Sequence, residues 1–519
     1  MMNTKNIYQD YSDNKKSLTK NILKQFNKKS LEYQFINVYF EATSGKSLQN
    51  ETTTSFKSFL INRYNYMMKF LSSSKESSLH ISPLNNQKEN TSYSLEIVTK
   101  DYQYLIFTIE NIFHSHNINI TKRYHPLFAV KCDKKNSVTS ISLPNKDDQL
   151  FSSIYIEFEL DESSELVQQL QAEIMDKIQA LKLLNQDKSK ILGHVKFIQE
   201  EVKQNPTPVK EFHTEWIELL DWLLNGNFTF LGCVEYKFSK SGKPIPDKKT
   251  GLGLFSPELK SNLYKELVHT TTAEVIRLKD YRSPFIFDRI QYISPVKSFE
   301  KVMRLSLKIK KSDNHIIEYN IVGLLRRMSL LSRNINTPII KQKMNTILAK
   351  KQFLEGTYNY NQVMRFLNKT PKFELFRTPT ENLQELIENL LSITNFSDLY
   401  LFTRRRIDQS KLFLLVVLPK NLYDHNTISK IVSFLSQEIP NTGVEYISID
   451  SDSFGRLHIY FNLKNDTHWQ PNLLDLESSL KELVLSWDDQ LKSLLKRTFS
   501  PSQGLKYYNK YSTCIPKTS

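Results

Sequence analysis

The sequence predicts an α+β fold with several ferredoxin-like β-α-β-β-α modules and connecting helices. Alternating apolar residues, typical of half-buried strands, recur between stretches whose apolar residues have helical spacing. One such series covers residues 92–185 and another covers residues 397–498. We expect each to form an antiparallel sheet with helices on one face. The length of 519 residues exceeds what one core needs and predicts roughly three or four domains.

Composition restricts the function classes. Hydrophobic residues are 39% and aromatic residues 12% of the chain, which favours packed cores. The net charge of +15 would suit a basic nucleic-acid-binding protein or another interaction scaffold, and this is the alternative function. Lysines are spread thinly, however, and the densest basic cluster, Arg404-Arg405-Arg406, lies beside a predicted strand. The charge pattern therefore does not favour nucleic acid as a partner.

Cysteines and apolar runs predict the compartment. Cys132, Cys233 and Cys514 lie far apart and form no disulfide framework, as expected in a reducing cytosol. No apolar run reaches membrane-spanning length, and no apolar stretch follows the first residues as it would in a secretory signal. We expect a cytoplasmic protein without a membrane partner.

The chain divides into four predicted domains. They are a helical N-terminal segment (1–90), a first module (91–190), a middle α+β region with a second module and helices (191–395), and a third module with a C-terminal helix (396–519). In the first segment, serines at 72–74 and 77–78 predict a loop. In the first module, helices are predicted over 104–113 and 165–184, and a separate helix follows over 193–203.

The middle region begins with a helix that ends at Asn225-Gly226, followed by a strand from Phe228 to Tyr236. Asn and Gly tolerate the left-handed conformation that ends helices. Gly232 inside the strand indicates a bulge or a close backbone approach, and a second glycine cluster follows at 251–255. Further on, Lys372 and Glu374 lie at a loop–helix junction, where we expect solvated or capping charges.

The third module has predicted strands at 399–403, 411–418, 444–449 and 456–463, with helices over 425–438 and 473–496. Phe413 to Val417 are almost wholly apolar, as in a buried strand. Asp450 and Asp452 lie in a turn that lacks the glycine and distal glutamate of a calcium loop. No metal site is predicted.

Several motifs resemble, in order, those of the large NAD-specific glutamate dehydrogenases of bacteria. "HPLFAVKCD" (125–133) is similar to the family's "HPVLXVXRD", and "NFTFLGCVEY" (227–236) is similar to "NFTFLGYREY". "RIQYISPVKSF" (289–299) lies where the family has "VHRXXYXDYIGVKXF", and "TPKFELFRTP" (370–379) resembles "YPRDELFQ". The resemblance covers about Leu95 to Tyr511. At the loop before the first module's helix, only Asp101 and an apolar tail remain of the family's "DDMPFLVDS".

The resemblance implies ACT-like modules that sense amino acids and build the oligomer. In the family the catalytic region lies further toward the carboxyl end, and no strand-GxGxxG-helix unit occurs in this sequence. We therefore expect no catalytic, cofactor-binding or metal residue here, with NAD bound only in the full family enzyme. That enzyme would oxidise glutamate to 2-oxoglutarate and ammonia. A separately encoded catalytic portion and a second copy of the chain are the expected partners. Whether the chain is a split subunit or the remnant of a broken gene stays open.

Two loops are candidate effector sites, because ACT-like modules tend to bind amino acids after a strand and before a helix. An amino acid offers a carboxylate and an ammonium, so a site needs a donor beside an acceptor. Lys100 with Asp101 supplies both charges in the first loop, and Lys420 with Asp424 supplies both in the second. A helix N-terminus after each loop would add N–H donors. The alternative is that these are ordinary solvated loop charges.

Overall fold

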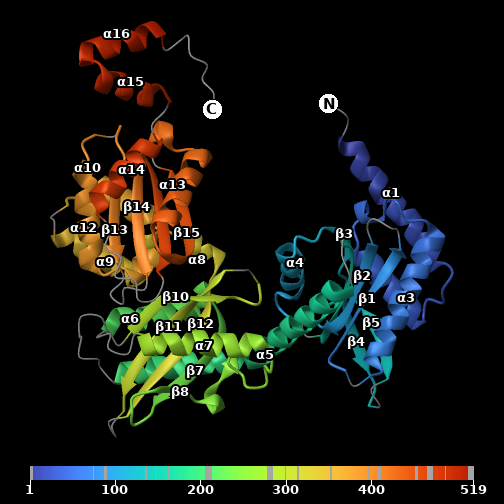
Figure 1. The fold of residues 1–519 in the computed structure, drawn as a ribbon. Coiled ribbons are helices and arrows are strands. Elements are labelled where there is room, and N and C mark those ends of the chain that lie inside the picture. Colours follow the sequence, from blue (N-terminus) through green and yellow to red (C-terminus); the bar gives the residue numbers. More distant parts are fainter. Residues whose placement is uncertain are drawn as a thin grey trace. The chain divides into compact units, whose positions relative to one another are not determined.

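The computed structural model describes residues 4–73, 75–86, 91–134, 137–145, 148–160, 164–204, 213–277, 285–297, 300–311, 315–350, 353–395, 397–405, 411–450, 454–463, 472–484 and 487–511. Figure 1 shows their helices and strands. The chain forms two compact units: the first contains Met1–His213, Leu223–Ile276 and Ser283–Ser329, and the second contains Thr214–Trp222, Arg277–Arg282 and Leu330–Ser519. Arg406, Asp452 and Cys514 lie outside the described residues. The four-domain division stays a prediction.

The first unit begins with helices α1 (Thr4–Leu23), α2 (Leu31–Ala42) and α3 (Thr53–Leu71). Sheet A follows, with strands β1 (Ser77–Asn86), β2 (Thr91–Lys100), β3 (Ile120–Tyr124), β4 (Leu127–Cys132), β5 (Val138–Ser142) and β6 (Leu150–Leu160). Its order is β1-β2-β6-β4-β5, with β3 also paired to β6, and each pairing is antiparallel. Helix α4 (Leu105–Ser115) connects β2 to β3.

Helices cover both faces of sheet A. Leu95 and Ile97 of β2 lie in a core with α4 and α5, whereas Val98 lies in a second core with α1, α2 and α3. The expectation of helices on one face was wrong for this module. The strands are apolar on both faces, as in Ile154-Tyr155-Ile156, so each face requires a cover.

Strand β1 occupies a segment in which serines predicted a loop. Leu79 and Ile81 alternate with polar residues there, and both pack against the core that sheet A forms with α4 and α5. Ser82 pairs with Ser94 of β2, and their hydroxyl oxygens are 3.1 Å apart. Cross-strand partners thus outweighed the turn propensity of serine.

Helix α5 (Ser164–Gln204) is one helix of 41 residues, where the sequence predicted two. Gly193 lies inside it with nothing within 4 Å of the position of an added Cβ. A single glycine costs only about 1 kcal/mol in a helix, and packing of Ile191 and Val195 on either side of it keeps the helix continuous.

Sheet B completes the first unit. Its strands are β7 (Phe228–Phe238), β8 (Pro244–Pro246), β9 (Leu252–Gly253), β10 (Phe285–Ile293), β11 (Lys301–Lys310) and β12 (Ile316–Leu325), in the order β10-β11-β12-β7-β8 with β9 on β7. Helix α7 (Asn262–Arg277), which the sequence did not predict, precedes β10.

The glycines of sheet B confirm two expectations. Gly226 has φ 87° after helix α6 (His213–Trp222), as a left-handed helix end requires. Gly232 faces Gly253 across β7 and β9. An added Cβ would lie 2.7 Å from Leu252 O at Gly232 and 2.5 Å from Leu231 O at Gly253, so the backbones approach closely. The register of β7 also shifts at this point, which marks a bulge.

The second unit contains a helical segment and sheet C. The helices are α8 (Arg327–Leu331), at the junction, then α9 (Ile340–Lys350), α10 (Tyr358–Lys369), α11 (Lys372–Arg377) and α12 (Thr380–Leu391). Sheet C has strands β13 (Tyr400–Arg405), β14 (Lys411–Pro419), β15 (Asn441–Asp450) and β16 (Phe454–Leu463), in the antiparallel order β13-β14-β16-β15. Helices α13 (His425–Glu438), α14 (Leu473–Val484), α15 (Trp487–Thr498) and α16 (Pro501–Tyr511) complete it.

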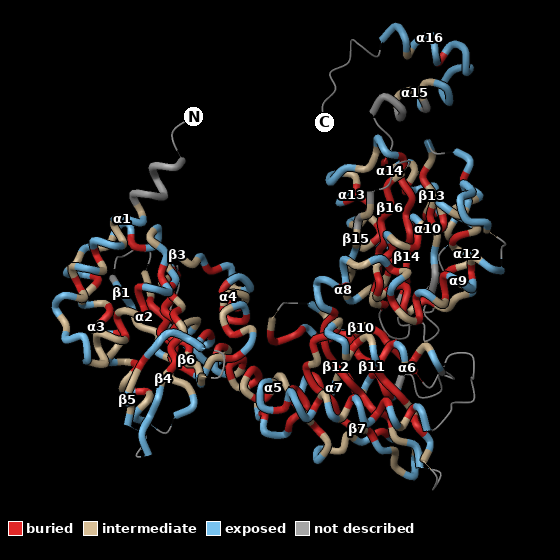
Figure 2. The backbone as a smooth tube through the Cα atoms, turned by 180° about the vertical axis from the view of Figure 1, so that it is seen from behind, coloured by how far each residue is buried: buried red, intermediate tan, exposed pale blue. Residues whose placement is uncertain are grey.

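Sheet C also has both faces covered. Leu457 and Ile459 of β16 pack in a core with α13 and α14. The alternate residues face the other way, where Arg456 contacts Phe366 of α10 and His458 contacts Glu374 of α11. Figure 2 shows buried residues concentrated along these strands. The one-face expectation is therefore wrong here as well.

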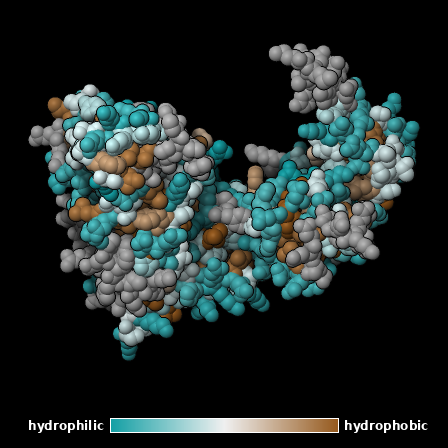
Figure 3. Space-filling view, turned by 45° about the horizontal axis from the view of Figure 1, so that its top comes forward, coloured by the Kyte–Doolittle hydropathy of each residue, from teal (hydrophilic) through white to brown (hydrophobic). Residues whose placement is uncertain are grey.

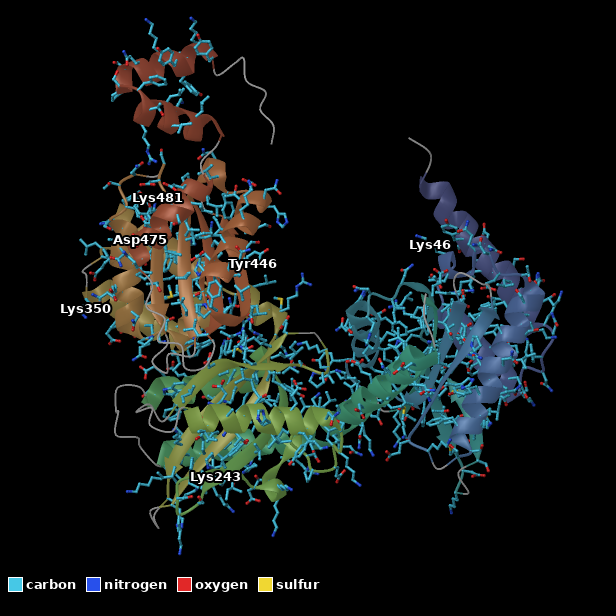
Figure 4. The ribbon with its side chains drawn as sticks, viewed as in Figure 1. Lys46, Lys243, Lys350, Tyr446, Asp475 and Lys481 are labelled. Carbon is cyan, nitrogen blue, oxygen red and sulfur yellow. The ribbon has the colours of Figure 1, made fainter. Side chains whose placement is uncertain are left out.

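Helix α14 is attached to β13 by charged contacts. Lys481, labelled in Figure 4, forms ion pairs with Asp398 at 3.2 Å and Glu477 at 2.8 Å, and its Nζ lies 5.6 Å from the centre of the Tyr400 ring. The Leu401 N–H donates to Glu477 Oε2 at 3.1 Å. These contacts fix the helix against the edge of sheet C.

Candidate binding sites in two strand-to-helix loops

The first candidate loop connects β2 to α4. Lys100 is exposed at the end of β2, and Asp101 follows it half-buried. The Asp101 N–H donates to Leu150 O at 2.9 Å, which continues the β2–β6 pairing by one residue. The two predicted site residues are therefore adjacent in space, on a loop that the sheet fixes.

A chain of hydrogen bonds holds the Asp101 side chain. The Ser152 hydroxyl donates to Asp101 Oδ1 at 2.7 Å, and His125 Nε2 lies 3.1 Å from Ser152 Oγ. Ser152 is fully buried. Because Ser152 donates its proton to Asp101, its oxygen can accept one from His125 Nε2. Burial lowers the pKa of His125, and Asp101 opposes that shift.

Two residues near α4, one directly before it and one between β10 and β11, have left-handed backbones although neither is glycine. Tyr104, the residue before α4, has φ 74°, and Lys297 has φ 72°. A bulky residue in this region costs of order 1 kcal/mol, and such strain is concentrated at functional sites. The strain here requires neighbours that hold the conformation.

Contacts with α4 keep Lys297 in this backbone conformation. The Lys297 N–H donates to Thr108 Oγ1 at 3.1 Å, and Asn111 Nδ2 donates to Lys297 O at 2.9 Å. The Lys297 ammonium donates to Thr229 Oγ1 at 3.2 Å and lies 5.3 Å from the centre of the Tyr104 ring. Among the described residues no carboxylate pairs with this ammonium.

The first loop thus combines the groups that an amino acid needs. Asp101 offers an oriented carboxylate, and Lys297 offers an ammonium whose partners are a hydroxyl and an aromatic ring. Tyr104 gives α4 no side-chain cap. The Leu105 N–H donates to Tyr102 O at 3.1 Å, and the N–H groups that follow it in the first turn can donate to an anion. The arrangement can bind a zwitterion, and it contains no nucleophile poised for catalysis.

The second candidate loop connects β14 to α13. Lys420 is exposed in a short 3-10 turn, Lys420–Leu422, and Asp424 precedes α13. Asp424 Oδ1 accepts from the N–H groups of Asn426 at 2.9 Å and Thr427 at 3.0 Å, and the Thr427 hydroxyl donates to Oδ2 at 2.6 Å. The Thr427 hydrogen bonds lower the pKa of Asp424. Its carboxylate caps the helix.

The expectation of solvated or merely capping charges at Lys372 and Glu374 was wrong. Glu374 is 1% exposed, and its Oε2 accepts from the Tyr460 hydroxyl and lies 3.1 Å from His458 Nδ1. Lys372 is 4% exposed and donates to Ser332 O at 2.8 Å and Asn334 Oδ1 at 2.6 Å. Side chains of α11 face sheet C and the helical segment in turn. Glu374 contacts sheet C and Lys372 contacts the helical segment, so both charged residues of the motif are buried.

Sequence reasoning missed the side chains that complete the first loop. His125 belongs to "HPLFAVKCD" and Lys297 to "RIQYISPVKSF", both of which were recognised as motifs. Neither lies near this loop in the sequence. Pairing within sheet A brings His125 to Ser152 and Asp101, and packing against α4 brings Lys297 to Tyr104. The signal available was that His125 and Lys297 each coincide with the same residue in the family motif that their stretch resembles.

Metal binding and membrane crossing find no support in the described ranges. No group of three or more His, Cys, Asp or Glu side chains there has the arrangement of a metal site. None of the helices in the described part of the chain has the length and hydropathy to cross a membrane. Figure 3 shows a largely hydrophilic face in which hydrophobic residues form small groups.

Three family models match the chain. The ACT1 domain of glutamate dehydrogenase matches residues 35–174, its helical motif 1 matches residues 337–395, and its ACT2 domain matches residues 401–488. The first therefore contains the Lys100–Asp101 loop, the second contains α9 to α12, and the third contains the Lys420–Asp424 loop.

Two curated relatives agree with these models. The NAD-specific glutamate dehydrogenase of Halomonas elongata is 21% identical over 446 residues, which are 82% of this chain and 27% of that protein. The NAD-specific glutamate dehydrogenase of Pseudomonas aeruginosa is 22% identical over 293 residues, which are 55% of this chain and 18% of that protein. The chain spans about a quarter of the length of the Halomonas protein and less than a fifth of the length of the Pseudomonas protein. It belongs to the NAD-specific glutamate dehydrogenase family and corresponds to the part that carries ACT1, helical motif 1 and ACT2.

Proposed function

We propose that this chain is the regulatory and oligomer-building part of an NAD-specific glutamate dehydrogenase, and that an amino acid bound before α4 is its effector. The observation that carries the proposal is an oriented acid at the start of the loop before α4 and, beside Tyr104 at the end of that loop, a base without a carboxylate partner among the described residues. Asp101 is held by Ser152, and Lys297 has a hydroxyl and a ring as its partners. The effector's ammonium would bind Asp101, with Lys100 at the rim, and its carboxylate would bind Lys297 and the start of α4.

The second loop would serve the same class of ligand. Lys420 is its exposed cation, and Asp424 is its acid. Because Asp424 already accepts three hydrogen bonds as a helix cap, this loop has less free acceptor capacity than the first. We therefore assign the principal site to the first loop.

Catalysis would take place outside these residues. In the complete enzyme, NAD and water would convert glutamate to 2-oxoglutarate and ammonia with formation of NADH. Hydride transfer requires a site that holds the nicotinamide against the substrate, and this sequence has no strand-GxGxxG-helix unit. A catalytic portion, in the same cytoplasmic compartment, and further copies of the chain are the proposed partners.

Calorimetric titration of the full chain with the common amino acids tests the effector site. At least one should bind, and Asp101→Asn or Lys297→Met should weaken that binding about tenfold or more, since a charge-assisted hydrogen bond contributes about 1.5–3 kcal/mol. Lys243→Met is the matched control, because Lys243 is exposed in the turn between β7 and β8. Absence of binding, or equal binding by all variants, would refute the site.

A second assay tests the proposal that catalysis takes place outside these residues. The purified chain should not reduce NAD in the presence of glutamate. Turnover above that of a mock preparation would show that a catalytic site exists within these residues.

A further inference from the structure

Helices α15 and α16 form a hairpin whose apolar side chains are exposed. They have 12 and 11 residues, and helices of this length are marginal in water without packing. Gly504 is buried against α15, since an added Cβ would lie 2.6 Å from Leu495 O. Figure 2 shows most of α16 as exposed. The large apolar side chains that the hairpin exposes are Leu494, Phe499, Leu505, Tyr507 and Tyr511. In the described part of the chain this apolar face has no cover.

The same hairpin is basic. Residues 490–511 contain five cations and no acid. None of the five cations forms an ion pair within the described residues, and two of them lie over aromatic rings instead. Lys492 Nζ is 4.5 Å from the centre of the Tyr508 ring, and Lys510 Nζ is 5.3 Å from the centre of the Tyr511 ring. A surface that combines exposed apolar side chains with unpaired cations fits an acidic, partly apolar partner.

Helix α12 carries an acidic stripe that matches this surface. Glu381, Glu385 and Glu388 are at positions i, i+4 and i+7, so they lie on one side of the helix, while Leu383 and Ile387 are buried on the other. Residues 378–397 contain these three acids and no cation. Like charges one turn apart repel each other, so a cationic partner would stabilise the helix.

The hairpin and the stripe are attached to opposite faces of sheet C. Helix α14 packs on the face that carries Leu457 and Ile459, and only two residues separate α14 from α15. Helix α12 packs on α9 and α10, in the helical segment that covers the face of Arg456. The hairpin of one chain therefore starts across the sheet from its own α12, whereas a second copy can offer its stripe directly.

We propose that the hairpin α15–α16 docks on α12 of a second copy of this chain, with Lys506 and Lys510 against Glu381 and Glu385. The inference rests on the proposed oligomer-building function and names the contact that carries it. The apolar side chains of the hairpin cover Leu386, which is half-buried beside the stripe. Each copy gives its hairpin and receives the other's, so the pair is closed and two-fold symmetric. Because α12 belongs to the matched helical motif 1, the contact connects that motif to the assembly.

Charge reversal on either side tests the contact. Sedimentation of the full chain should show a dimer or larger assembly that dissociates on dilution and at high salt. Glu381→Lys with Glu385→Lys makes the stripe basic, and Lys506→Glu with Lys510→Glu makes α16 acidic. Each double variant should raise the dissociation constant about tenfold or more, because two surface ion pairs become two repulsions.

A mixture of the two double variants separates a contact between copies from a contact within one chain. Each variant opposes itself, but the hairpin of either one matches the α12 of the other, so mixing should restore the assembly. A contact within one chain would gain nothing from mixing. Lys46→Glu with Lys240→Glu is the matched control and should assemble like the original chain. It makes the same change of charge at two exposed lysines of the first unit, of which Lys46 is labelled in Figure 4.

The outcomes distinguish this contact from the proposed function. Assembly of both double variants as tight as that of the original chain, or weakened assembly that mixing does not restore, overturns the hairpin contact and leaves the oligomer-building function standing. A chain that is monomeric at every concentration refutes both, while the effector titration remains a separate test. If the monomeric chain binds anionic lipid vesicles or DNA, and Lys506→Glu with Lys510→Glu abolishes that binding, the hairpin has a different partner and the proposal is wrong.

Discussion

In the first ACT module the sheet supplies the acid of a buried polar contact, whereas in the second the covering helix supplies it. Glu96 of β2 pairs with Arg63 of α3, and both side chains are about one-tenth exposed. In the second module Glu374 of α11 contacts His458 and Tyr460 of β16, with Glu374 and His458 almost fully buried. Each module thus attaches an extra helical layer to the second face of its sheet through a contact of one buried carboxylate. That carboxylate belongs to the sheet in the first module and to the covering helix in the second.

The difference teaches that these contacts position the layers rather than strengthen them. An apolar face alone would let a covering helix slide, because the hydrophobic effect has no direction. A buried charge is satisfied in one register only, and breaking it by removing one partner leaves the other uncompensated. The acid can belong to the sheet or to the covering helix, so no shared sequence motif would mark the two positions.

Glu374→Ala is the strongest test of whether the buried carboxylate holds the layers of the second module together. It leaves His458 and Tyr460 without their carboxylate, and we expect a loss of about 3–5 kcal/mol from the stability of the second unit. Hydrogen exchange should accelerate in β14 and β16 and stay unchanged in β2 and β6. Equal exchange in β16 before and after the substitution would mean that the contact does not hold the layers.

The pH dependence of the second unit is the next largest effect. Burial lowers the pKa of Lys372 to about 8 from its ordinary value of 10.5. Between these values the unfolded chain binds a proton that the folded chain has released, so stability should rise with pH from about 8 to 10.5 and be constant on either side for this group. The gain is at most about 3 kcal/mol.

Urea unfolding followed across that pH range measures the Lys372 effect. Lys372→Met should remove the part of the slope that Lys372 contributes and leave the part from Lys301 of the first unit, whose pKa burial also lowers to about 8. A slope as steep in the variant as in the original chain would assign the effect to another group.

Arg63→Met tests the corresponding contact in the first module and should cost less than Glu374→Ala. Glu96 is 9% exposed, so water can partly solvate the abandoned carboxylate, and the methionine keeps apolar contact with Tyr155 and Phe59. We expect a loss of about 2 kcal/mol. Thermal unfolding of the variant beside Glu374→Ala ranks the two, and a larger loss for Arg63→Met would reverse the comparison.

The smallest effect concerns the loops. Asp424→Ala removes the cap of α13 and should cost about 1 kcal/mol, whereas Asp424→Asn should cost almost nothing, since asparagine caps equally well. Asp101→Asn should be the opposite case, with lost effector binding and little lost stability. If Asp424→Asn destabilises the unit as much as Asp424→Ala, the carboxylate has a role beyond capping.

The sequence predicted most strands and helices but few of the contacts that assemble a site. Alternation of apolar residues identified β2 and β6, a continuous apolar run identified β14, and Gly232 marked a close approach that the structure confirms. The prediction from sequence failed at Lys372 and Glu374, because a buried charged residue cannot be told from a surface one until the strand that faces it is known. His125 and Lys297 escaped notice for a related reason, since antiparallel pairing and inter-sheet packing bring them to Asp101 and Tyr104 from distant parts of the chain.

The length of helix α5 has a consequence for how the first unit forms. At about 1.5 Å per residue the helix extends roughly 60 Å, and it contacts sheet A in its first half and sheet B in its second. Asp187, near its middle, accepts from the Gly253 N–H at 3.0 Å. The sheets share this one element and one continuous core, so neither has a complete native interior until the other is made. Folding during synthesis would then wait for the glycine pair of sheet B, and the unit would open as a whole rather than sheet by sheet.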